Sequence, residues 1–213
     1  MQPKYTKWED ISISTYNKIR KIQKEDVDDI TKEVMVLSVL CECSEDDIWE
    51  LKMNELNDLR TKLQFLQITE DVKKKKEFKR ITIDGVECDV ITDLNKFSYA
   101  QYVDFQTFYP EEDGLAKILS TAVIPRGKKY NEGYDIVDFI DKISNNVDIV
   151  TANSITFFLQ KNFLNSIRRI NNYFRAHLRV KKMMMRKKNP AYPMIQEAIK
   201  SSVKLHILLG SVL

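Results

Sequence analysis

The longest periodic stretch of the chain is residues 148–189, DIVTANSITFFLQKNFLNSIRRINNYFRAHLRVKKMMMRKKN. Apolar residues recur along it at helical spacing, and no proline or glycine interrupts it before Pro190. This pattern predicts a continuous helix that begins after Asp148. About 40 residues at ~1.5 Å each would span ~60 Å, which is longer than a domain of this size. We therefore expect its far end to project or to break.

The composition also favours helices. The chain has 213 residues, with five glycines and five prolines, and 43% of its residues are hydrophobic. All-β folds need many turns, so the scarcity of Gly and Pro favours long helices with few connections. The hydrophobic fraction is sufficient for a packed core.

The first third of the chain predicts short helices with polar caps. Ser12 or Ser14 precedes the first helix, Asp26 or Asp28 begins the second, and Ser44 precedes three acidic residues that suit a helix start. The expected bundle covers residues 12–67, and its apolar faces hold Tyr16, Ile19, Ile22, Val27, Ile30, Val34, Leu37, Leu40, Ile48, Trp49, Leu51, Leu56, Leu59, Leu63 and Leu66.

The pattern changes from helix to strand near residues 78–91. Residues 81–90, ITIDGVECDV, alternate apolar and polar positions on each side of Asp84-Gly85. That dipeptide tolerates the positive φ angles of a type I′ turn, so we predict a β-hairpin. Two strands alone are marginally stable, so the hairpin must pack on the helices or on a partner.

Further helices follow the hairpin. One begins at Ser98, another covers residues 111–123, and a third begins near Asp135, with a loop over residues 125–130. Aromatic residues in the helices could stack on bases, but their helical spacing and the few cations among them favour core packing. These residues are Tyr99, Tyr102, Phe105, Tyr109, Phe157, Phe158 and Phe163.

The sequence therefore predicts a mainly α fold with one small β-hairpin and a long C-terminal helical arm. We expect a helical body at residues 1–165, with the hairpin near 78–91. Residues 166–213 are expected to form a basic helical arm that ends in an apolar helix.

Charge is distributed unevenly along the chain. The net charge is +3, yet residues 149–213 hold 12 Lys/Arg and one acid (+11), while residues 1–148 hold 22 Lys/Arg and 30 Asp/Glu (−8). A basic arm of this kind could dock on nucleic acid or on an acidic protein surface, including the protein's own body.

The cations of the arm are the candidate contacts to nucleic acid or to an acidic partner, because cations without local acids can neutralise phosphates. The alternative is a solvated helix face that lies on the acidic body. Tyr173, Phe174 and the adaptable Met183, Met184 and Met185 lie among them. The cations are Arg168, Arg169, Arg175, Arg179, Lys181, Lys182, Arg186, Lys187 and Lys188.

The C-terminal stretch holds the candidate subunit contacts Leu205, Ile207, Leu208 and Leu209. Standing free, it would expose an apolar patch, so it packs on its own domain or inserts into another subunit. Either arrangement favours an assembly protein over an enzyme.

Nothing in the sequence predicts a catalytic site, a metal or a cofactor. The two histidines, His177 and His206, lie far apart, and the three cysteines, Cys41, Cys43 and Cys88, form no CxxC motif. No phosphate-binding glycine loop or nucleophile-elbow motif occurs. The odd cysteine count favours a reducing compartment, and no apolar run reaches the ~20 residues that span a bilayer.

Several blocks of sequence, taken in order, resemble a family of small morphogenesis and virion proteins from tailed phages of Bacteroidetes, including the crAss-like group. The blocks are Trp8-Glu9-Asp10-Ile11-Ser12-Ile13 with Tyr16 and Ile19, Val36-Leu37-Ser38-Val39-Leu40, Ser44-Glu45-Asp46-Asp47-Ile48, residues 56–66, the hairpin, Phe97-Ser98-Tyr99-Ala100-Gln101-Tyr102-Val103-Asp104, Ile124-Pro125 with Tyr130, and Phe157-Phe158-Leu159. The likeness covers residues 8–165.

This family is similar to phage tail-assembly chaperones, whose LSxLxxxSxxDIxxL helical pair the chain also shows. The resemblance implies phage particle assembly, either as a tail- or portal-associated virion protein or as a tail-assembly chaperone, and transfers no catalytic residue. Expected partners are other tail or portal proteins, packaged DNA and further copies of the chain. Expected locations are the host cytoplasm during assembly and the virion. A nucleic-acid-binding accessory protein that uses residues 168–188 is the alternative. The basic extension after Ser166 departs from a plain transient chaperone and favours a retained protein.

Overall fold

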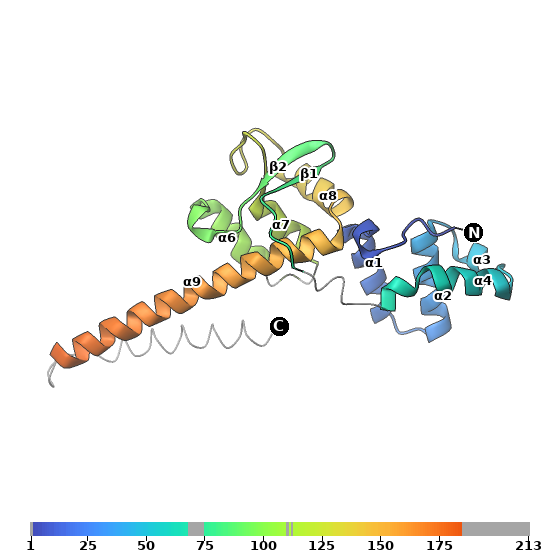
Figure 1. The fold of residues 1–213 in the computed structure, drawn as a ribbon, viewed down its shortest axis with the longest axis horizontal. Coiled ribbons are helices and arrows are strands. Elements are labelled where there is room, and N and C mark those ends of the chain that lie inside the picture. The colour runs from blue at the N-terminus through green and yellow to red at the C-terminus, as the bar shows by residue number, and fades with distance from the viewer. Residues whose placement is uncertain (1, 68–74, 110, 112, 185–213) are drawn as a thin grey trace. The chain divides into compact units, whose positions relative to one another are not determined.

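The structure is a computed structural model that describes residues 2–67, 75–109, 111 and 113–184 (Figure 1). The chain is mainly helical with a small antiparallel sheet, which confirms the predicted fold class. It divides into two compact units, Met1–Leu164 and Asn165–Leu213, and the boundary falls within the long helix α9 (Ile149–Met184).

Polar caps define the first helices. The Ser12 side chain accepts a hydrogen bond from the Thr15 amide at the start of α1, and Asp28 does the same for two amides of α2. Ser44 and Asp47 form a reciprocal capping box at α3. The elements are η1 (Trp8–Asp10), α1 (Ile13–Lys24), α2 (Asp29–Cys41), α3 (Glu45–Trp49), α4 (Met53–Lys62) and η2 (Gln64–Gln67). The last predicted helix of this group is shorter than expected, because Leu66 lies in η2 rather than in α4.

These helices enclose a hydrophobic core. Its buried members include Tyr5, Trp8, Ile11, Ile19, Val34, Leu37, Leu40, Ile48, Leu59, Leu63 and Ile149. Three residues that the sequence assigned to apolar inward faces are instead exposed: Val27, Ile30 and Trp49. The core therefore uses part of each apolar stripe and leaves large apolar side chains on the surface.

The predicted hairpin is present as β1 (Arg80–Ile83) and β2 (Val86–Val90). Asp84 and Gly85 have φ angles of 49° and 75°, the positive values that a type I′ turn requires. The strands pair antiparallel, with Ile83 opposite Val86. The Lys142 ammonium lies 4.0 Å from the Asp84 carboxylate, which connects the turn to α8 (Ile136–Asn146).

A third strand, β3 (Val123–Pro125), pairs antiparallel with β2 and completes a sheet of order β1-β2-β3. The sequence assigned residue 123 to a helix and residue 125 to a loop, and both assignments are wrong. A three-residue strand is too short to show alternation, and its proline is tolerated because β3 is an edge strand. The hairpin therefore gains its support within its own chain.

The remaining elements of the first unit are η3 (Leu94–Lys96), α6 (Tyr99–Phe108) and α7 (Leu115–Ala122). Helix α7 packs against both α6 and α8. The side chain of Gln101 is buried, and its amide nitrogen donates to the Thr121 carbonyl at 2.9 Å, which ties α6 to the end of α7. Phe105 is fully buried as predicted, but Tyr99, which the sequence assigned to the core, is 84% exposed.

Helix α9 joins the N-terminal segment to the rest of the first unit. The Ile13 amide donates to the Val147 carbonyl at 3.1 Å, and the Ile149 amide donates to the Ile11 carbonyl at 2.8 Å. Over residues 149–164 the helix buries Ile149, Ala152, Ile155, Leu159 and Phe163. Phe157, which the sequence also assigned to the core, is exposed on the other side of the helix.

Candidate interaction surfaces

The described part of the basic segment presents its cations to solvent. Arg168, Arg169 and Arg175 on α9 all have exposed side chains. Tyr173 and Phe174 between them are 67% and 52% exposed, with their rings 6.0 Å apart in an edge arrangement. These five residues combine positive charge with flat apolar surface, which suits contact with a macromolecule.

The other predicted contact residues are less defined. Arg179, Lys181 and Lys182 lie within α9, but only their backbone is described. Arg186, Lys187 and Lys188, and also Leu205, Ile207, Leu208 and Leu209, lie outside the described residues.

A second surface, which the sequence interpretation missed, lies at the junction of α3 and α4. Trp49 is 57% exposed and Met53 is 65% exposed. Glu45, Asp46 and Glu50 beside them are exposed too. Below, the name Trp49–Met53 face denotes these five residues. The sequence alone does not exclude Trp49 from the core, because adjacent helical residues point ~100° apart and both can be buried, as Ile118 and Leu119 are on α7.

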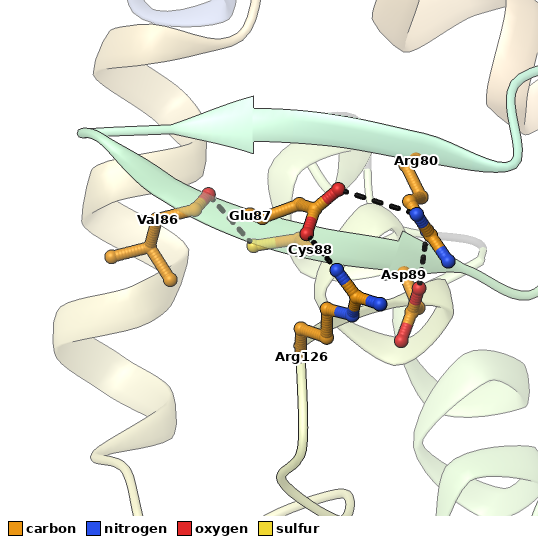
Figure 2. A network of polar contacts seen from close by, with 6 residues as sticks. All are labelled: Arg80, Val86, Glu87, Cys88, Asp89 and Arg126. Carbon is orange, nitrogen blue, oxygen red and sulfur yellow. Dashed lines mark hydrogen bonds and ion pairs between the residues drawn. The ribbon is translucent and has the colours of Figure 1, made fainter.

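An ion network covers the solvent face of the sheet (Figure 2). The Arg80 guanidinium contacts Asp89 at 3.2 Å and Glu87 at 3.5 Å, and Arg126, which follows β3, pairs with Glu87. The hydrogen bond from Arg126 is the main reason that the pKa of Glu87 lies below its usual value. The network links β1, β2 and the residue that follows β3. These charged residues therefore have a structural role that requires no catalytic one.

A polar groove lies between β1 and the α8–α9 junction. Its volume is about 380 Å³, and Arg80, Thr82, Asn146 and Asp148 contribute to its lining. Asp148 accepts a hydrogen bond from the Thr151 amide at 2.8 Å as the cap of α9, and Arg80 belongs to the sheet network. Its charged groups are therefore committed to structural contacts.

Tyr130 and Asp104 form a tie between the loop after β3 and α6. The Tyr130 hydroxyl donates to the Asp104 carboxylate at 2.7 Å. Burial, and then this hydrogen bond, raise the pKa of Tyr130 well above its usual value. The phenol stays neutral near pH 7, so it serves as a hydrogen-bond donor and not as a base.

The three cysteines are free thiols in structural surroundings. Burial, with a smaller effect of neighbouring Cys43, raises the pKa of Cys41 to about 11. A thiol of that pKa is protonated near neutral pH and is a poor nucleophile. Within the described ranges, no group of three His, Cys, Asp or Glu residues is placed to hold a metal ion. No helix of that same part of the chain has the length and apolarity to cross a membrane.

Comparison with known proteins gives no relative: no protein-family model, no curated protein and no solved structure matches the chain. The two exposed surfaces and the order of the sequence blocks are therefore the features of the chain that bear on its function.

Proposed function

We propose that the chain acts in bacteriophage particle assembly, as a tail- or portal-associated virion protein or a tail-assembly chaperone, and that it works by protein–protein contacts. One observation carries the contact part of this proposal: the Trp49 and Met53 side chains are exposed at the end of α3 and the start of α4, on a unit that buries its other tryptophan, Trp8. The phage setting comes from the resemblance of the sequence blocks.

Exposed Trp and Met side chains are typical of binding surfaces. Trp is enriched among the residues that dominate interface energetics, and Met adapts to partners of different shape. Two of the resembling blocks supply the α2–α3 pair, in which Leu37, Leu40 and Ile48 are buried. That packing fixes Trp49 on the outer side of α3. The same sequence pattern therefore builds the support and leaves the contact residue exposed.

The first experiment is quantitative mass spectrometry of purified particles of the source phage. A fixed ratio of this chain to the major capsid protein is expected for a virion component. Abundance in infected cells combined with absence from particles would select the chaperone form of the proposal. Absence from both tail intermediates and particles, measured after cross-linking, would contradict it.

A complementation experiment tests the contact surface. A phage that lacks the gene would be supplied with Trp49→Ser/Met53→Ser, and particle yield would be measured. We expect binding to tail components to weaken on the order of tenfold or more, with a matching fall in yield. The matched control is Tyr99→Ser/Val137→Ser, which removes one exposed aromatic and one exposed aliphatic side chain elsewhere. Equal yields from the two variants would argue against a role for the face.

We propose nucleic-acid binding by α9 as the second candidate function. The favouring observation is that Arg168, Arg169 and Arg175 are exposed together with Tyr173 and Phe174, and that no acid occurs in residues 149–184. Cations neutralise phosphates, and exposed aromatic rings can stack on bases.

Salt dependence of binding tests this candidate. Fluorescence anisotropy with single- and double-stranded DNA at several salt concentrations gives the slope of log affinity against log salt. Arg168→Gln/Arg169→Gln/Arg175→Gln is expected to reduce that slope by up to about 3, roughly one for each lost phosphate contact. Lys79→Gln/Lys96→Gln/Lys128→Gln, which removes three exposed lysines of the first unit, is the control. Equal slopes in both variants would exclude the segment as a DNA contact.

A further inference from the structure

We infer that the Trp49–Met53 face binds the basic segment of α9 from a second copy of the chain. This inference concerns self-association, so it stands or falls separately from the phage setting proposed above. It rests on an unpartnered apolar surface, on the charges around that surface and on the composition of α9.

The face lies in the most acidic part of the chain. Residues 25–58 hold 12 Asp/Glu and two Lys, a net charge of −10. Glu33 and Glu42 of this region pair with Arg60 and Lys4. Among the described residues, however, Glu45, Asp46 and Glu50, which lie within four positions of Trp49 on α3 and its C-cap, form no ion pair. The acidic rim of the apolar surface is therefore open to cations from elsewhere.

The basic segment has the opposite character. Arg168, Arg169 and Arg175 form no ion pair with any other residue that the structure describes. Arg168 and Arg175 are seven residues apart, and Arg169 and Tyr173 are four apart, so each pair lies along one side of the helix. Arg168 and Arg175 therefore share one side of the helix, Arg169 and Tyr173 share a second, and Phe174 lies on a third, so that exposed cations are present on two sides of this helix.

The two surfaces match in chemistry. A guanidinium over an indole face gains a cation–π interaction, and Trp, Tyr and Arg are the residues most enriched at the centres of interfaces. The described α9 residues from 165 to 184 span ~30 Å at ~1.5 Å per residue, whereas α3, which carries three of the five residues of the face, spans only about 8 Å. A helix of that length is long enough to cover the face.

A second copy is the partner that these charges fit best. The same chain carries −10 over residues 25–58 and +11 over residues 149–213. Two copies related by a two-fold axis would make this contact twice, which doubles its stabilising effect without requiring another protein. A different basic partner, or the α9 of the same chain, would make the contact only once, and the experiment below distinguishes both.

The test is sedimentation of the full chain across a range of concentrations, at low and high salt, with two charge-reversal variants. One is Glu45→Lys/Asp46→Lys/Glu50→Lys, and the other is Arg168→Glu/Arg169→Glu/Arg175→Glu. Self-association is expected for the natural chain at low salt, and each variant alone should weaken it on the order of tenfold or more. An equimolar mixture of the two variants should associate again, because both contacts of the mixed pair join opposite charges: the reversed face meets the reversed segment, and the natural face meets the natural segment.

Two controls keep the result specific. Glu77→Lys/Glu132→Lys/Asp141→Lys changes the same charge at exposed positions outside the face and should associate like the natural chain. Circular dichroism and urea unfolding check that the face variant stays folded, because Glu45 and Asp46 lie in the first turn of α3 and their reversal removes favourable dipole contacts, while the Ser44–Asp47 capping box is left in place.

Three results would overturn the inference. The natural chain could remain monomeric at all concentrations at low salt, it could associate to the same extent in both reversal variants, or the mixture could fail to associate. In the first of these cases, a monomer whose sedimentation changes in either variant alone would identify the α9 of the same chain as the occupant.

Discussion

The two parts of helix α9 share one backbone conformation and differ in whether their apolar side chains are buried. Over residues 149–164 one side of the helix is buried, with Ile155 and Leu159 among its side chains, whereas Tyr173 and Phe174 further along are exposed. Both parts are predicted by the same spacing of apolar residues. Periodicity therefore indicates the helix but does not say which apolar side chains stabilise the fold and which remain available to a partner.

The largest expected difference between the two parts is in stability. Leu159→Ala should lower the free energy of unfolding by about 2–5 kcal/mol, because it leaves a cavity at a fully buried position. Phe174→Ala removes a larger side chain from the surface and should change that free energy by less than about 0.5 kcal/mol. Urea unfolding followed by circular dichroism measures both. Similar losses from the two variants would show that Phe174 is packed and would remove the contrast.

A hydrogen bond gives the second, smaller difference. The Asn162 side-chain amide donates to the Thr92 carbonyl at 2.9 Å, while Asn172 on the same helix is exposed. Asn→Ala gains the same helix propensity at both positions, so the difference between Asn162→Ala and Asn172→Ala isolates the bond. We expect Asn162→Ala to be less stable than Asn172→Ala by about 1 kcal/mol in thermal unfolding. No difference would mean that water replaces the amide at no cost.

A buried hydroxyl should give a gain of stability. Among the described residues, the Thr156 hydroxyl has no hydrogen-bond partner although it is buried on α9. Thr156→Val keeps the shape and removes the unsatisfied group, and we expect it to raise the free energy of unfolding by roughly 0.5–1 kcal/mol. Ser154→Ala is the control, since the Ser154 hydroxyl donates to the Val150 carbonyl at 2.8 Å and its removal should bring no such gain. A loss on Thr156→Val would show that the hydroxyl is satisfied in solution.

Locally encoded features of the fold were predictable from the sequence. The Asp84-Gly85 turn and the Ser44 cap depend on residues within four positions of each other, and both are present. Of the alternative caps, Ser12 and Asp28 are the ones used, a choice that depends on where each helix meets the core. Strand β3 was missed because its three residues become a strand only by pairing with β2, more than 30 positions earlier in the chain.

The candidate surfaces divide in the same way. The cations of the basic segment were found because charge is visible in composition, and the exposure of Arg168, Arg169 and Arg175 agrees with a solvated helix face. The Trp49–Met53 face was missed because an apolar residue in a helix is assigned by default to the core. Only the burial of neighbouring Ile48 shows which of the two adjacent residues faces inward.

The exposure of a side chain, rather than its place in the first unit, should decide how much it contributes to the stability of the fold. The Glu33–Arg60 ion pair tests this expectation, and its effect should be the smallest of those considered. Arg60 donates from Nε and Nη2 to the two Glu33 carboxylate oxygens at 2.6 and 2.7 Å, which joins α4 to α2. The hydrogen bond from Arg60 is the main reason that the pKa of Glu33 lies below its usual value of 4.5. Because the folded pKa is lowered, the stabilisation is present above about pH 4.5 and is lost as pH falls through the folded value. Both side chains are more than a third exposed, so solvent screening limits the contribution to roughly 0.5 kcal/mol.

Urea unfolding of Glu33→Gln against the natural chain should show that difference at pH 7 and none at pH 3, whereas Asp58→Asn, at an exposed acid of α4, should show none at either pH. A difference in the free energy of unfolding that persists at pH 3 would mean that Glu33 stabilises the fold through packing and not through its charge. The exposed Glu33 side chain would then contribute in the same way as the buried side chains of α9.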